Sequence, residues 1–240
     1  MSKTKHIFAV LILSLLGITL LISLNKLPNQ FEYANSIYHH VVNNSISETG
    51  SLNFVTAILY DYRAYDSLGE STIIFGAVSG IVLLLSRKTL PVSSHGLSFI
   101  VKRTFGMLTP FIFLFSIYII THGHLSPGGG FQGGVILGAI SIIFSIVYGS
   151  EFDYKRYSPT TKTLLETSGA LLFIGLGLLG ILIGGNFLMN LEILNAEVGS
   201  LLSAGSIPFI NIGIGFKIGA GLAIIFYSMI QKTFKEEVDL

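Results

Sequence analysis

The sequence predicts an all-α integral membrane protein with six transmembrane helices, two followed by four. Apolar residues make up 51% of its 240 residues and charged residues 11%, with a mean hydropathy of +0.73. Six stretches are apolar enough to be considered as membrane spans, and Lys and Arg residues gather in alternate connecting segments. This composition is typical of membrane proteins, and a soluble fold is not expected.

Each predicted helix follows from an apolar stretch close to the roughly 20 residues that cross a bilayer. The stretches are residues 7–24, 71–86, 105–120, 131–149, 164–187 and 207–230. The second and third are slightly short, so we expect flanking residues to lengthen them. The first follows Lys3 and Lys5 as a secretory signal would, but its apolar run is longer than usual and no small-residue cleavage pattern precedes Asn25. We therefore interpret it as a retained helix.

The positive charges predict the orientation, because Lys and Arg near helix ends are held on the cytoplasmic side. With the N-terminus inside, eleven of the 14 Lys and Arg residues face the cytoplasm. These are Lys3, Lys5, Arg87, Lys88, Lys102, Arg103, Lys155, Arg156, Lys162, Lys232 and Lys235. Lys26 and Arg63 lie outside, and Lys217 lies within a helix. Both termini are therefore expected to be cytoplasmic.

Several function classes are not expected. A net charge of +1, with basic residues confined to short inner loops, argues against a nucleic-acid partner. The chain has no cysteine, which excludes disulfides, thiolate metal sites and protein-ligated iron–sulfur clusters. The glycines at 128–130 lack the Gly-Lys-Ser/Thr and preceding strand of a phosphate-binding loop. We expect no cofactor, metal site or covalent catalysis in this chain.

The chain divides at a polar segment that carries Pro91 and Gly96. We expect a two-helix module at 1–88, a cytoplasmic linker at 89–104 and a four-helix module at 105–240. In the outside segment of the first module, residues 52–60 are too short to span and predict an interfacial helix. The last two helices are rich in glycine, which lets helices approach closely, either within the chain or against another subunit.

Charged residues directly precede the second span. If residues 66–70 are helical, Asp66 and Glu70 lie on one face as i and i+4, and Glu70 enters the membrane at its outer edge. A carboxylate there predicts a proton or cation site if it faces a hydrated interior. The alternative is an interfacial ion pair of Arg63 with Asp66, with Glu70 placed favourably near a helix N-terminus.

Lys217 lies near the middle of the last span, where a lysine must pair with a carboxylate or face water. It is a candidate for proton transfer, with a structural ion pair or a snorkelling side chain as the alternatives. Glu166 lies near the cytoplasmic start of the fifth span. We interpret it as an interfacial carboxylate, with a place on an ion pathway as the alternative.

The polar stretch THGHLSPGGGFQGG separates the third and fourth spans. His122 and His124 suit proton handling near neutral pH, although a structural turn or a partner contact explains them equally well. Two histidines with no nearby carboxylate are a weak metal pattern. An irregular, tightly packed start of the fourth helix is predicted from Pro127, Gly128, Gly129, Gly130, Gly133 and Gly134.

Two motifs resemble parts of one family of membrane complexes. THGHLSPGGGFQGG with the following VILGAI resembles the B subunit of Mrp-type multi-subunit sodium/proton antiporters, the MnhB-like domain, over about residues 105–230. NFVTAILYDYRAYDSLGE resembles the C-terminal end of the large A subunit, which is a separate small subunit in membrane-bound hydrogenases. The chain thus resembles a fusion of two neighbouring subunits.

This resemblance implies a subunit of a Na+/H+ antiport module in a prokaryotic inner (plasma) membrane, with other antiporter membrane subunits as partners. A redox-driven pump with hydrogenase or sulfur reductase subunits, or a structural spacer in either complex, is the alternative. It also implies that Glu70 lies on a sodium or proton route, accompanied by Asp66 and Arg63. Ser67 departs from the threonine common before LGE. Lys217 lies outside both motifs.

Overall fold

The structure is a computed structural model that describes residues 31–85, 96–194 and 196–238, together with short helical pieces between residues 11 and 22. The chain forms two compact units, residues 1–43 and 44–240. Every regular element in the described residues is a helix, which confirms the all-α prediction there. Most of the first predicted span and residues 89–95 of the predicted linker lie outside the described residues.

Helix α2 (Phe31–Thr49) lies in the segment between the first two predicted spans and was not predicted, because its many polar residues leave no apolar run. The helix expected at 52–60 is found as α3 (Phe54–Ala57) followed by a π-helical turn, η1 (Ile58–Tyr62), and its place at the membrane interface stays a prediction. Helix α4 (Ala64–Leu85) begins earlier than the apolar stretch at 71, which gives this span the length it lacked.

The second module contains α5 (Phe99–Thr121), α6 (Gly130–Tyr148), the short α7 (Ser150–Arg156), α8 (Pro159–Gly184), a 3-10 turn η2 (Glu192–Leu194) and α9 (Ile207–Val238). Helix α5 starts six residues before the predicted boundary at 105. Lys102 and Arg103 therefore lie on this helix. Their long side chains can keep the charged ends in water.

Five described helices are long and apolar enough to cross a membrane, namely α4, α5, α6, α8 and α9. This makes the chain a multi-pass membrane protein. The sixth span and the cytoplasmic position of both termini stay predictions.

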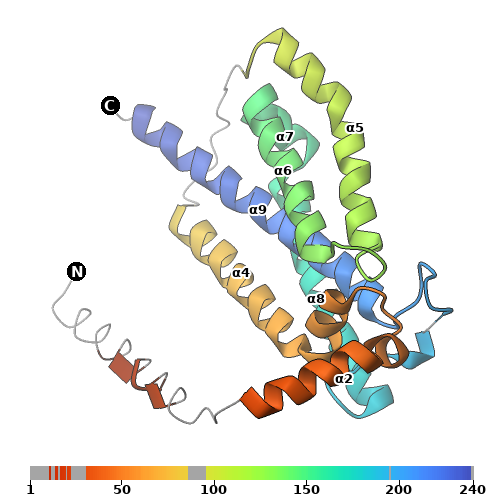
Figure 1. Cartoon of the computed structure of the whole chain (residues 1–240). Coiled ribbons are helices and arrows are strands. Elements are labelled where there is room, and N and C mark those ends of the chain that lie inside the picture. The colour runs from red at the N-terminus through yellow and green to blue at the C-terminus, as the bar shows by residue number, and fades with distance from the viewer. Residues whose placement is uncertain are drawn as a thin grey trace. The chain divides into compact units, whose positions relative to one another are not determined.

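Helix α9 lies at the centre of the 44–240 unit. It packs against α4, α6 and α8, while α5 packs mainly on α6 (Figure 1). In the apolar part of α9, 67% of the residues are buried inside the bundle, whereas 39% or less are buried in the apolar parts of the other four spans. Ile207, Ile210, Ile214 and Ile218 of α9 contribute to a core that also contains Phe173 of α8. Helix α9 therefore organises the bundle.

Glycines allow the neighbours of α9 to approach its backbone. A Cβ atom added at Gly134 of α6 would lie 2.8 Å from the Gly215 carbonyl oxygen, and one added at Gly138 would lie 2.9 Å from that of Gly219. On the other side of α9, a Cβ at Gly169 of α8 would overlap the Gly213 carbonyl oxygen. The glycines of α9 thus pack within the chain, which answers a question that the sequence left open.

The loop between α5 and α6 is bound to the segment before α3. Asn53 Nδ2 donates to the carbonyl oxygens of Gly123 (2.8 Å) and Ser126 (2.9 Å), and Thr56 Oγ1 donates to Gly123 (2.7 Å). The His124 carbonyl oxygen accepts from the Ser51 hydroxyl and the Asn53 backbone N–H, both at 3.0 Å. The histidine-glycine loop therefore joins residues 51–56 to the helices α5 and α6.

The close approach at Gly169 gives a stability prediction. Gly169→Val should destabilise the purified complex by roughly 1–3 kcal/mol or prevent assembly, because the side chain separates α8 from α9. Gly175→Val on the same helix is the matched control, since a Cβ there meets nothing within 4 Å. Thermal unfolding and the yield of assembled complex measure both; equal behaviour of the two variants would contradict the packing.

A second prediction concerns Asn53. Its Oδ1 accepts from the Val55 and Thr56 N–H groups and caps α3, while its Nδ2 binds the loop. Asn53→Asp keeps the cap acceptor but places a carboxylate against two carbonyl oxygens. We expect it to loosen the loop, seen as faster hydrogen exchange at residues 123–126 in the assembled complex. Unchanged exchange in Asn53→Asp would show that the loop does not depend on these bonds.

Candidate functional site

A buried ion pair joins the last helix to α8. Lys217 Nζ lies 3.3 Å from Glu166 Oε1, and the two residues are only 1% and 4% exposed. Lys217 follows the start of α9 by ten residues, a rise of about 15 Å, near the middle of a hydrocarbon core about 30 Å thick. The carboxylate partner that its depth demands is thus Glu166.

The Glu166 side chain is enclosed in the bundle, and its place at the membrane interface stays a prediction. The start of the helix explains this enclosure. Helix α8 begins at Pro159, capped by the Ser158 hydroxyl that accepts from the Thr161 N–H, rather than near residue 164. Glu166 therefore lies about two turns inside the helix, level with Lys217 of α9.

Helix α4 completes the enclosure of the pair. Lys217 Nζ lies 4.9 Å from the centre of the Phe75 ring, an attractive position for a cation. A Cβ at Gly221 of α9 would lie 3.2 Å from Val78 Cγ2 and 3.9 Å from Glu166 Cγ. The absence of a side chain at Gly221 therefore leaves room for the carboxylate between α4, α8 and α9.

Glu70 lies beside the buried stripe of α4, which consists of Ala64, Ser67, Ser71 and Val78, and it precedes Ile74 by one turn. Figure 1 shows α4 and α9 side by side and running in the same direction. Glu70 is exposed on the isolated chain and is not joined to the buried pair. It lies near Tyr60, whose pKa is raised mainly because burial disfavours the phenolate, with the Glu70 carboxylate adding to the effect.

Arg63 and Asp66 form an exposed ion pair at 2.5 Å, just before and in the first turn of α4. Their side chains are 67% and 48% exposed, so solvent screens the attraction. The structure therefore brings these two together at the outer end of α4, in the arrangement that the sequence offered as the structural alternative.

The two histidines lie in different surroundings. His122 stacks on Tyr118 with ring centres 4.3 Å apart. His124 is fully buried, and its Nε2 lies 3.4 Å from the Ser200 carbonyl oxygen. Burial is the main cause that lowers the pKa of His124, so its ring is neutral near pH 7. Within the described residues, no three His, Asp or Glu side chains gather as a metal site would require.

The glycines after His124 shape the start of α6. Gly128 and Gly129 have φ angles of 147° and 148°, which disfavour other residues. The Gly130 N–H donates to Asn211 Oδ1 of α9 at 2.8 Å. A Cβ at Gly133 would overlap Ile120 of α5. Pro127 lines a shallow outer pocket with Asn53 and Leu125. These positions set the backbone of the loop and the approach of α6 to its neighbours.

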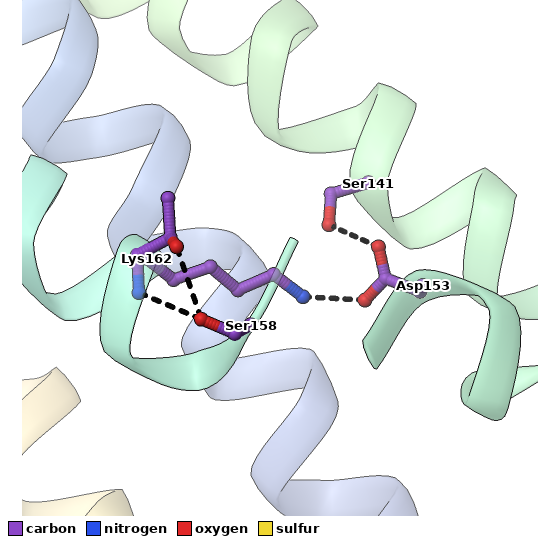
Figure 2. A network of polar contacts seen from close by, with 5 residues as sticks. Ser141, Asp153, Ser158 and Lys162 are labelled. Carbon is purple, nitrogen blue, oxygen red and sulfur yellow. Dashed lines mark hydrogen bonds and ion pairs between the residues drawn. The ribbon is translucent and has the colours of Figure 1, made fainter. Parts of the chain in front are cut away.

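A second buried ion pair was missed by sequence reasoning. Lys162 of α8 is bonded to Asp153 Oδ2 of α7, and Ser141 Oγ of α6 donates to Asp153 Oδ1 at 3.0 Å (Figure 2). Lys162 is 4% and Asp153 1% exposed. The sequence placed Lys162 among the cytoplasmic basic residues, and its spacing of nine residues from Asp153 gives no helical pattern that would reveal the pair.

Two protein families match the chain in succession. The domain related to the MnhB subunit of Na+/H+ antiporters matches residues 100–224, and the MbhE family, a subunit of MBH, matches residues 6–98. An uncharacterized protein of Methanocaldococcus jannaschii is 32% identical over 78% of this chain and 83% of its own length. The B subunit of the Na+/H+ antiporter of Alkalihalophilus pseudofirmus is 30% identical over 34% of this chain, which corresponds to 56% of that protein.

The fold is also similar to a solved structure. A chain in the structure of the membrane-bound sulfane sulfur reductase, an archaeal respiratory membrane complex, aligns with a TM-score of 0.72 and 30% identity. The alignment covers 95% of this chain and 98% of that one. Together with the antiporter matches, these findings show that the chain belongs to the MnhB-related family of Na+/H+ antiporter subunits and carries an MbhE-like segment before that domain.

Proposed function

We propose that this chain is a membrane subunit of a multi-subunit Na+/H+ antiport module, and that Glu70, Glu166 and Lys217 mark an ion route along α4, α8 and α9. The observation that carries the proposal is the Lys217–Glu166 pair, buried at 3.3 Å in an apolar bundle. Ionisable residues inside membranes are costly to bury and mark ion or proton routes in transport proteins. The matches to antiporter subunits agree with this role.

The proposed organisation follows the two family matches. Residues 1–88 form the module that resembles the end of an antiporter A subunit, 89–104 the linker and 105–240 the MnhB-like domain; the matches at 6–98 and 100–224 support this division. The chain has six spans with both termini in the cytoplasm of a prokaryotic plasma membrane. Its partners are other antiporter membrane subunits, and the transported ions are Na+ and H+.

The parent complex can alternatively be a redox-driven pump. The similarity to a chain of an archaeal respiratory complex, over nearly the full length of both, favours this second candidate. In either complex this chain performs no covalent catalysis, and the same charged residues serve the membrane arm.

Within the route, the pair acts as a switch of local charge. A proton or cation that reaches Glu166 neutralises or shares its carboxylate and weakens its attraction for Lys217. The ammonium group then has its nearest attractive surface at the Phe75 ring of α4. Glu70, in the second turn of α4 toward the outside, provides the outer carboxylate. Exposed Arg63 and Asp66 surround it at the membrane surface.

The pair is tested by neutralising both members. Glu166→Gln with Lys217→Met leaves no unpaired buried charge, so the complex should assemble. Sodium-driven proton movement in everted membrane vesicles should fall by about tenfold or more, because the titratable groups are lost. Glu197→Gln, which removes an exposed carboxylate of the outer loop, is the control. Wild-type exchange in the double variant would sink the role of the pair and leave a structural spacer.

Glu70 gives an independent test. Glu70→Gln should leave assembly intact, because the side chain is exposed on this chain, and should abolish sodium/proton exchange. The same vesicle assay measures exchange, and native gels measure assembly. Normal exchange in this variant, combined with loss of the complex on replacing Gly133 by leucine, would instead favour a subunit that only binds its neighbours.

A further inference from the structure

The Asp153–Lys162 pair resembles the candidate site in its chemistry but lies nearer the cytoplasmic end of α8. Both side chains are at most 6% exposed. Asp153 accepts from Lys162 and from the Ser141 hydroxyl, so each carboxylate oxygen has a donor (Figure 2). Lys162 Nζ also lies 5.0 Å from the centre of the Tyr227 ring of α9. Three spanning helices and α7 thus contribute to a second enclosed charged cluster.

The two ion pairs are consecutive along one helix face. Lys162 and Glu166 are spaced as i and i+4 on α8, which places their Cβ atoms about 5–6 Å apart. Both face α9, where Glu166 pairs with Lys217 and Lys162 approaches Tyr227. The order Lys217, Glu166, Lys162, Asp153 therefore alternates in charge from the middle of the membrane toward the cytoplasmic side.

The inner pair also borders a cavity. A space of about 180 Å³ lies between α5, α6, α8 and α9, and its polar lining includes Ser141, Thr161 and Lys162. Its lining is otherwise mostly apolar, but Tyr157 and Thr161, which also line it, are exposed, so water can approach the inner pair at this end of α8. A buried ion pair adds little net stability compared with well-packed apolar residues, so stability alone does not account for a second one.

We propose that Asp153 and Lys162 form the cytoplasmic half of a proton path that leads to Glu166. This inference rests on the proposed function of the Lys217–Glu166 pair and extends it to residues that neither sequence motif contains. The path runs along the α9-facing side of α8, with the cavity beside Ser141 as its connection to water.

The transfer is balanced with the groups present. Lys162 gives a proton to the Glu166 carboxylate and becomes a neutral amine. It regains a proton from Asp153 once that carboxylate has accepted one from a hydronium ion in the cavity, which leaves neutral water. The net result moves one proton from the cavity to Glu166, and the reverse sequence returns it. The other ionisable groups near the path are Tyr227 and Tyr157, with Lys155 and Arg156 exposed on α7.

The test replaces both members of the inner pair. Asp153→Asn with Lys162→Met removes the titratable groups without leaving a lone buried charge, and Arg103→Gln, which removes an exposed charge near the start of α5, is the control. In the intact complex, we expect normal assembly and a fall in sodium-driven proton movement of about tenfold or more. The control should match the wild type.

The outcomes separate this inference from the proposed function. If Glu166→Gln with Lys217→Met stops exchange while the inner double variant exchanges normally, the inner pair is a structural clamp and only this inference fails. If both double variants exchange normally, the proposed function fails as well. Should the inner double variant not assemble, Asp153→Glu decides, because it keeps the carboxylate but moves it. We expect that variant to assemble with a shifted pH profile of exchange; an unchanged profile overturns the inference.

Discussion

The close approach of α8 and α9 at Gly169 and Gly213 is the contact on which the rest of the bundle depends. Because neither residue has a side chain, the two backbones meet where a Cβ would overlap a carbonyl oxygen. That approach brings Glu166 within reach of Lys217 and removes both from the lipid. A wider separation would leave two charges in hydrocarbon without partners, which membranes tolerate poorly. The two glycines therefore allow both the close packing of α8 and α9 and the pairing of Glu166 with Lys217.

The histidine-glycine loop stabilises the opposite face of the same helix. Asn211 of α9 accepts from the N–H at the start of α6, while Gly134 and Gly138 lie against Gly215 and Gly219. On its outer side the loop offers backbone carbonyl oxygens to side chains of the first module. Its glycines and the buried His124 therefore connect residues 51–56 with α6 and α9. The Lys217–Glu166 pair lies on the other side of α9, against α4 and α8.

Much of the fold can be predicted from the sequence, because the bilayer sets the length of the apolar helices and the side on which basic residues lie. Lys217 was recognised as a residue that needs a partner from its depth alone. Glu166 lies about two turns inside its helix because α8 begins at Pro159 after the Ser158 cap, earlier than its apolar stretch indicates. The pair of Asp153 and Lys162 was not predicted, because it depends on the direction in which α7 leaves Gly149. No periodic pattern in the sequence indicates that direction. Which charged residues pair between two helices depends on how far the helices are shifted along each other. That shift is set by side-chain packing.

The central claim is that the buried charges of this bundle change state during transport. Difference infrared spectroscopy of the intact complex, between sodium-free and sodium-loaded states, tests this most directly by observing carboxyl groups as they gain or lose protons. We expect a protonated-carboxyl band that disappears in the double variant Glu166→Gln with Lys217→Met, which leaves no lone buried charge. Identical difference spectra of the wild type and that variant would contradict the claim, and would show that the buried pair is a fixed part of the scaffold.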